Sequence, residues 1–168
     1  MQRRTLLKLG LGSAVVLAAA GGGLALLRPG LEGTKLSVGG RAMFGAVARA
    51  VLDGMLPAAE AARDAAVQAH LGRLDDTIAM LAPATRGELS QLVALLGSLP
   101  GRKWLAGLDA DWPAASPAQV QAALQSMRAS TVALRQQAYH ALRDLTNAAY
   151  FADPGAWPAI GYPGPRAL

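Results

Sequence analysis

Apolar residues recur at helical spacing along most of the chain, and no segment shows the strict alternation of a half-buried strand. A first helix is predicted over residues 44–55 and ends before Pro57. A second helix is predicted over residues 58–81. The apolar stripes of these two helices are formed by Phe44, Val47, Val51, Leu52 and Met55 and by Val67, Leu71, Leu74, Ile78 and Leu81.

A third helix is predicted to begin at Pro83, because proline suits the first helical position, where no backbone N–H is needed. Its buried face contains Leu89, Leu92, Val93 and Leu96. Pro100 and Gly101 are typical of a helix end. Residues 101–115 contain two Trp, two Asp, two Gly and a Pro, which predicts a loop with at most one short turn.

A last helix is predicted to begin at Pro117, with Ser116 as its N-cap and Gln119 completing a capping box. Its apolar positions alternate in steps of four and three, a spacing that packs against other helices at a shallow angle. This single seam contains Val120, Leu124, Met127, Thr131, Leu134, Ala138, Ala141, Leu145 and Ala148. The patterns together predict an all-α fold, a small bundle of about four helices.

The first eight residues carry an Arg pair followed by Leu and Lys, at Arg3, Arg4, Leu7 and Lys8, and residues 9–27 are apolar. This order resembles the twin-arginine export signal, used in bacteria for proteins that cross the membrane already folded. Five glycines make the apolar run less hydrophobic than an ordinary secretory signal. The alternative is a plain membrane anchor with an accidental Arg pair on its cytoplasmic side.

The sequence leaves cleavage of this segment undecided. Nineteen residues are close to the ~20 that span a hydrocarbon core, so the segment can also stay as an anchor. An Ala-x-Ala site at residues 18–20 lies inside the apolar run instead of after it. We therefore expect a periplasmic protein, either free or anchored to the inner membrane. The predicted parts are a signal peptide or signal anchor (1–28), a linker (29–40), a helical domain (41–150) and a Pro/aromatic tail (151–168).

The net charge of +5 belongs to the start of the chain. Residues 1–41 carry six basic side chains and one acidic one, whereas the remaining 127 residues carry ten of each sign. A basic surface able to neutralise several phosphates is therefore not expected in the folded part, and no nucleic acid is predicted as a partner. The chain has no Cys, which excludes disulfides, iron–sulfur clusters and covalent haem attachment.

No catalytic, cofactor-binding or metal-binding residues are predicted. Asp75 and Asp76 are neighbours on a helix and point about 100° apart, which favours a solvated face over an acid–base pair. His140 and Asp144 can form an i, i+4 pair, but no Ser or Thr lies on the next turn, so an ordinary surface pair is favoured. His70, beside Leu71, is also interpreted as a residue without a catalytic role.

The C-terminal tail differs in composition from the rest of the chain. Four of the eight aromatic residues, Tyr150, Phe151, Trp157 and Tyr162, fall within thirteen positions, among prolines and glycines. Prolines predict a stiff, non-helical segment, and a stiff aromatic segment loses little entropy when it docks. Packing onto its own bundle and contact with a partner are equally compatible with this composition.

The tail resembles that of the gluconate 2-dehydrogenase subunit 3 family, the small subunit of membrane-bound FAD dehydrogenases. The resemblance is carried by Tyr150-Phe151, Pro154, Trp157 and the run Ile160-Gly161-Tyr162-Pro163-Gly164-Pro165, together with the twin-arginine leader and Leu56-Pro57. If a partner docks on this stiff aromatic tail, we expect the contacts at Tyr150, Phe151, Trp157, Ile160, Tyr162 and Pro163.

The resemblance further implies a non-catalytic subunit without a cofactor of its own. Its expected partners are a flavoprotein of the glucose-methanol-choline type, which holds FAD, and a cytochrome c subunit, which holds haem c. The membrane is a further contact through residues 9–27 if they are not removed. Two other hypotheses stay open: a membrane-tethered periplasmic helical module that binds a partner or apolar ligand without any oxidoreductase, and an enzyme in its own right.

Overall fold

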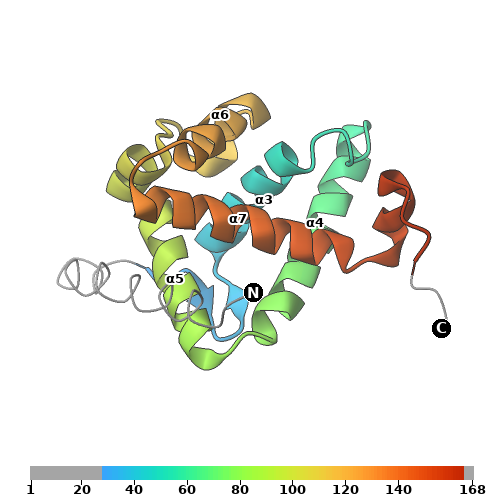
Figure 1. Ribbon diagram of the computed structural model, residues 1–168, viewed down its shortest axis with the longest axis horizontal. Coiled ribbons are helices and arrows are strands. Elements are labelled where there is room, and N and C mark those ends of the chain that lie inside the picture. Colours follow the sequence, from blue (N-terminus) through green and yellow to red (C-terminus); the bar gives the residue numbers. More distant parts are fainter. Residues whose placement is uncertain (1–27, 165–168) are drawn as a thin grey trace.

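Five α-helices account for most of residues 28–164, which is the part of the chain that the computed structural model describes (Figure 1). They are α3 (Val38–Val51), α4 (Glu60–Ala79), α5 (Pro83–Gly97), α6 (Pro117–Arg128) and α7 (Ala133–Phe151). Short helical segments are η1 (Gly101–Ala106), η2 (Trp112–Ala114) and η3 (Pro154–Ile160), and a hairpin is formed by β1 (Leu31–Glu32) and β2 (Lys35–Leu36). The mostly helical class is confirmed. The described residues do not include the predicted export signal at Arg3, Arg4, Leu7 and Lys8, the apolar run 9–27 or Pro165.

Helix α3 lies at the centre of the fold and contacts each of the other four α-helices. Its side chains Met43, Phe44 and Val47 are fully buried. Helices α4 and α7 also pack on one another, and Figure 1 shows α4 and α5 diverging from the turn that joins them. One core therefore runs through all five helices. Within residues 28–164, none of the helices has the length and apolar character to cross a bilayer.

The predicted linker over residues 29–40 is wrong, because most of this segment is packed structure. Leu31 and Leu36 face each other in the β1–β2 hairpin and are both buried. Gly30 N–H donates to the Ser90 carbonyl at 3.3 Å, and a Cβ on Gly30 would lie 2.5 Å from that same oxygen. Glycine is therefore needed where this strand crosses α5. Ser37 then caps α3 by accepting from Gly40 N–H.

The predicted single last helix is wrong as well, because it is interrupted between α6 and α7. In the break, Ser130 Oγ accepts from Val132 N–H at 3.1 Å, and the Ser130 carbonyl accepts from Gln136 Nε2 at 2.8 Å. Such local side-chain bonds compete with helix continuation. The capping box at Ser116 and Gln119 and the start of α5 at Pro83 are confirmed.

The interruption changes which residues of α7 face the core. Val120, Leu124 and Met127 in α6 are buried as predicted, but Thr131 and Ala148 are exposed. The buried positions of α7 are Ala138, Leu142, Thr146 and Ala149. A continuous seam was the wrong prediction because α6 and α7 are separate helices, so one stripe continued through both does not follow the core.

The predicted loop over residues 101–115 contains the short helices η1 and η2. Trp112 in η2 is buried and its indole N–H donates to the Leu96 carbonyl at 2.9 Å. This bond satisfies a polar atom in the interior and ties the segment to the C-terminal end of α5.

Candidate partner-binding site

Two aromatic residues lie at the C-terminal end of α7, and one of them, Tyr150, joins this helix to the segment after α3. Tyr150 is half-buried and its hydroxyl donates to the Met55 carbonyl at 3.2 Å. Phe151 is also half-buried and packs edge-on against Tyr150, with 5.3 Å between ring centroids. Tyr150 therefore ties the end of α7 to the bundle, and the following segment begins from this end.

Residues 153–164, which we name the C-terminal hook, form a turn built around Trp157. The indole N–H of Trp157 donates to the Phe151 carbonyl at 2.8 Å, and Tyr162 N–H donates back to the Trp157 carbonyl at 3.1 Å. The Trp157 and Tyr162 rings pack edge-on at 5.3 Å. Gly161 ends η3 with φ 71°, a conformation that other residues rarely adopt. Residues 154–160 form a 3-10 helix, so the prediction of a non-helical tail is wrong for these residues.

Asp153 fixes the hook to the bundle. One of its carboxylate oxygens accepts from Gly155 N–H at 2.9 Å, and the other lies 3.2 Å from Arg73 Nη1. Arg73 Nε also donates to the Ala149 carbonyl. The sequence analysis missed Arg73, because a surface arginine in the middle of α4 gives no signal that it reaches residues about 80 positions later.

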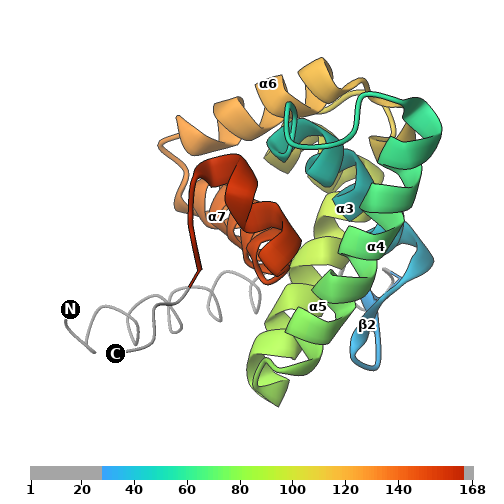
Figure 2. The same ribbon diagram turned by 90° about the vertical axis from the view of Figure 1, so that its right-hand side faces the viewer.

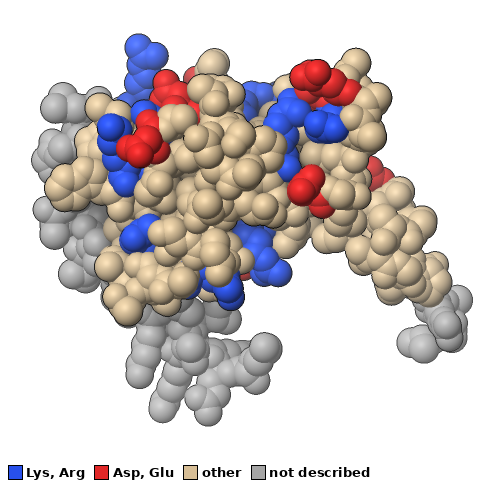
Figure 3. All heavy atoms as spheres, turned by 90° about the horizontal axis from the view of Figure 1, so that it is seen from above, with Lys and Arg blue, Asp and Glu red and all other residues tan. Residues whose placement is uncertain are grey.

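The outer side of the hook is apolar and exposed. Ile160 is 54 % and Tyr162 46 % exposed, and Pro163 is exposed too. A hollow of about 350 Å³ in the hook is lined by Pro154, Trp157, Pro158, Gly161, Tyr162 and Pro163. Figure 3 shows the hook as a lobe at the lower right that carries no charged side chain on the face in view.

The structure thus divides the six residues predicted to bind a partner. Tyr150, Phe151 and Trp157 are half-buried and pack on their own chain, whereas Ile160, Tyr162 and Pro163 are exposed. Packing of the tail onto its own chain is therefore observed for the first three residues, whereas contact with a partner stays a prediction for the other three. The inner half makes the hook rigid, and the outer half is the surface that a partner can reach.

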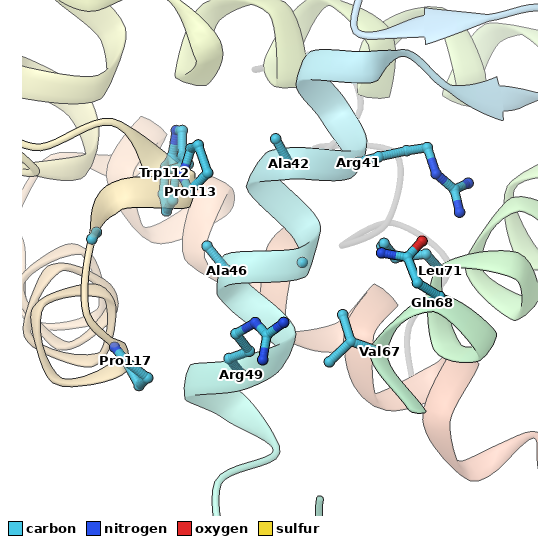
Figure 4. A pocket seen from close by; sticks show the side chains of 12 residues that line it. Arg41, Ala42, Ala46, Arg49, Val67, Gln68, Leu71, Trp112, Pro113 and Pro117 are labelled. Carbon is cyan, nitrogen blue, oxygen red and sulfur yellow. The ribbon is translucent and has the colours of Figure 1, made fainter. Parts of the chain in front are cut away.

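A second hollow of about 260 Å³ runs along α3, between α4 and the segment from η2 to α6 (Figure 4). Its walls are mostly small or apolar, with two guanidinium groups at its edge. Arg41 pairs with Asp75 and Arg49 with Asp64, each at 2.6 Å. Because both cations already have carboxylate partners, this hollow does not offer a free positive charge to an anionic ligand.

Asp75 and His70 were both interpreted in the sequence as residues without a special role, and both are buried. Asp75, predicted on a solvated face, is 9 % exposed and accepts hydrogen bonds from Leu36 N–H at 2.8 Å and from Arg41 Nη1 at 2.6 Å. The prediction failed because the donors come from the hairpin and from α3. Asp76 is exposed as predicted.

His70 is fully buried in α4, and neither ring nitrogen has a hydrogen-bond partner. Its ring lies 6.3 Å from that of Tyr150. Burial, with a smaller contribution from the positive charge of Arg73, lowers the pKa of His70 from 6.5 to about 4. The imidazole is therefore neutral at pH 7.

The described residues do not bring acid–base or metal-ligating side chains together. Asp144 accepts from its neighbour Arg143 at 3.0 Å, and His140 packs against Tyr139 on the exposed side of α7. Between residues 28 and 164, His, Asp and Glu do not gather in groups of three at distances that suit a metal ion. The exposed side of the hook is therefore the strongest candidate site.

Comparison with models of known families, with curated proteins and with solved structures gives no match to this chain.

Proposed function

We propose that this chain is a non-catalytic subunit that binds a flavoprotein dehydrogenase and directs it through the twin-arginine export pathway. The proposal combines the leader, Arg3, Arg4, Leu7 and Lys8, with the tail motif that resembles the gluconate 2-dehydrogenase subunit 3 family. The partner would hold FAD, and a cytochrome c subunit would hold haem c. The complex would work in the periplasm, at the inner membrane.

The observation that carries the proposal is the exposed side of the C-terminal hook. Docking of a preformed apolar surface requires little further ordering, which favours affinity. Trp157 is held by a hydrogen bond to Phe151 and by the ring of Tyr162, and Asp153 is tied to Arg73. Ile160 and Tyr162 are exposed on this support, and tyrosine is enriched among the residues that contribute most to binding in protein interfaces.

Purification from detergent-solubilised membranes tests this function. The full chain is expected to co-elute with flavin absorbance and a second chain of dehydrogenase size. Replacing both Ile160→Asp and Tyr162→Asp should remove that second chain, because two charges would be buried in an apolar contact. A Met80→Asp variant is the matched control, since Met80 is 80 % exposed but lies on the turn between α4 and α5.

Two outcomes would contradict the proposal. A colourless chain that elutes alone from the wild-type preparation would favour the other function considered, a membrane-tethered module unrelated to an oxidoreductase. Equal loss of the flavoprotein in the hook variant and the Met80 variant would move the interface away from the hook.

A further inference from the structure

The buried imidazole of His70 lies where the end of α7 is held against α4. His70 has no exposed surface, and its ring lies 6.3 Å from that of Tyr150, the last tyrosine of α7. Neither ring nitrogen has a hydrogen-bond partner among residues 28–164. A neutral imidazole can stay in such a site, whereas a protonated one would bury a charge and two N–H donors without acceptors.

The two residues that attach this end of the molecule, Tyr150 and Arg73, are also the ones that act on the imidazole. The Tyr150 hydroxyl donates to a carbonyl of the segment after α3 at 3.2 Å. Arg73 Nε donates to the Ala149 carbonyl at 3.3 Å, and Arg73 Nη1 lies 3.2 Å from an Asp153 carboxylate oxygen. Arg73 is one turn of α4 away from His70. A charge on the imidazole would therefore act directly on the attachment of the hook.

The surroundings of His70 hold no carboxylate that is free to pair with a protonated ring. Asp153, on this side of α4, is already paired with Arg73. Helix α4 packs mainly against α3, α7 and β2. The other charged or titratable residues described on these three elements face solvent or contact other groups; they are Lys35, Arg41, Arg49, Arg135, Tyr139, His140, Arg143 and Asp144.

We propose that His70 controls the attachment of the hook: when its imidazole takes up a proton, the last turn of α7 and the hook separate from α4. A protonated ring requires water, and water enters most easily where the covering segment has few other contacts. Helix η3 packs mainly on α7. Figure 2, which looks at the molecule from this end, shows η3 in front of α7, on the outside of the bundle.

The rest of α7 stays in place in this opening. Ala138 and Leu142, two to three turns before Tyr150, belong to the core that runs through the whole bundle. Separation of the end exposes His70 to water but leaves that core closed. The opening is a property of this chain alone. Its consequence, that a flavoprotein on the hook would bind less tightly in acid, rests on the proposed function.

The size of the effect follows from the two environments of the imidazole. The buried ring has a pKa of about 4, because of burial and the charge of Arg73, and a ring in water has the ordinary value of 6.5. The open form therefore binds a proton that the closed form excludes, so acid favours the open form. Between pH 7 and 5 the population of the open form should rise about 20-fold.

Labelling of a single introduced thiol tests this inference, since the chain has no Cys of its own. Ala149→Cys places a thiol in the last turn of α7. Ala138→Cys is the matched control, because both alanines are fully buried in the same helix. Each full-length variant is purified in detergent without a flavoprotein and treated with a pyridyl disulfide at pH 7 and 5, in water and in dilute urea. A short Cys peptide corrects for the reactivity of the thiol at each pH.

The Ala149→Cys variant should be labelled faster than the Ala138→Cys variant, about 20-fold faster at pH 5 than at pH 7, and with little dependence on urea. A weak urea dependence marks a local opening, because little surface is exposed. Labelling of the Ala138→Cys variant should require unfolding of the bundle and rise steeply with urea. Adding His70→Leu to Ala149→Cys should remove the effect of acid, whereas adding His140→Gln should not.

Three results would overturn the proposal. The two thiols could be labelled at one rate with one urea dependence, so that only unfolding of the whole bundle exposes them. Labelling of the Ala149→Cys variant could be independent of pH, or it could respond to acid equally with His70→Leu. The first two comparisons do not need the His70 variant, and none of them needs a partner. Failure here is therefore distinguishable from failure of the hook to bind a dehydrogenase.

Discussion

Replacing Asp75 by alanine is expected to lower the free energy of unfolding by about 3 kcal/mol, because it removes a buried carboxylate that accepts from two donors. The Leu36 N–H would lose its acceptor in the interior, and the Arg41 guanidinium would lose its counter-charge. Arg41 is 35 % exposed, so water compensates part of the loss at that end. Urea unfolding followed by circular dichroism measures the change.

The neighbouring residue provides the control for this prediction. Asp76→Ala should change the free energy of unfolding little, because Asp76 is exposed. Asp75→Asn should lie between the two, since the amide oxygen can still accept from Leu36 N–H but carries no charge for Arg41. Equal stability of the two alanine variants would mean that Asp75 does not hold the hairpin against α3 and α4.

Acid is expected to destabilise the fold by about 3 kcal/mol through His70 alone as the pH falls from 7 to 4. The pKa of His70 is lowered from 6.5 in the unfolded chain to about 4 in the folded one. Above pH 6.5 the residue is neutral in both states and has no effect. Between pH 6.5 and 4 the unfolded chain binds a proton that the folded chain excludes. The free energy of unfolding therefore decreases as the pH is lowered through this window.

Urea unfolding of the wild type at a series of pH values measures this dependence. A His70→Leu variant should show a much flatter profile between pH 6.5 and 5, because the buried group no longer titrates. His140→Gln is the matched control and should keep the wild-type slope, since His140 is exposed on α7. A His70→Leu profile as steep as that of the wild type would show that other groups cause the acid sensitivity.

Helix ends were predictable from the sequence where one local residue decides them. Pro83 begins α5 because it needs no N–H donor there, and Ser116 with Gln119 begins α6 through two local hydrogen bonds. The core faces of α3 and α4 also follow their apolar spacing. In each case the interacting residues lie within a few positions of one another.

Features that depend on distant residues were not predictable in the same way. The hairpin at residues 31–36 has strands of two residues, too short to show alternation, and its position depends on Asp75 and Ser90. The break between α6 and α7 preserves the four-and-three spacing of apolar residues in the sequence, so periodicity alone predicts one helix. Burial of His70 follows from packing of α4 against α7, which no local pattern encodes.

The candidate site was predictable in part. Composition identified the aromatic, proline-rich tail, but it could not separate residues that pack inward from residues that stay exposed. That division follows from the bond between Trp157 and Phe151 and from the ion pair between Asp153 and Arg73. Trp104 is 86 % exposed, which was not predictable either, since an isolated tryptophan in a sequence is as compatible with a core as with a surface.

The central claim is that this chain carries a flavoprotein dehydrogenase across the membrane. Replacement of both leader arginines by lysine tests this claim most directly. Cells that express Arg3→Lys and Arg4→Lys together are fractionated, and flavin-dependent dehydrogenase activity is measured in cytoplasm and periplasm. Arg28→Lys, which also conserves charge but lies outside the export motif, serves as the control. We predict that the double variant retains the dehydrogenase in the cytoplasm and that the control exports it; a dehydrogenase that still reaches the periplasm with the double variant would contradict the carrier role.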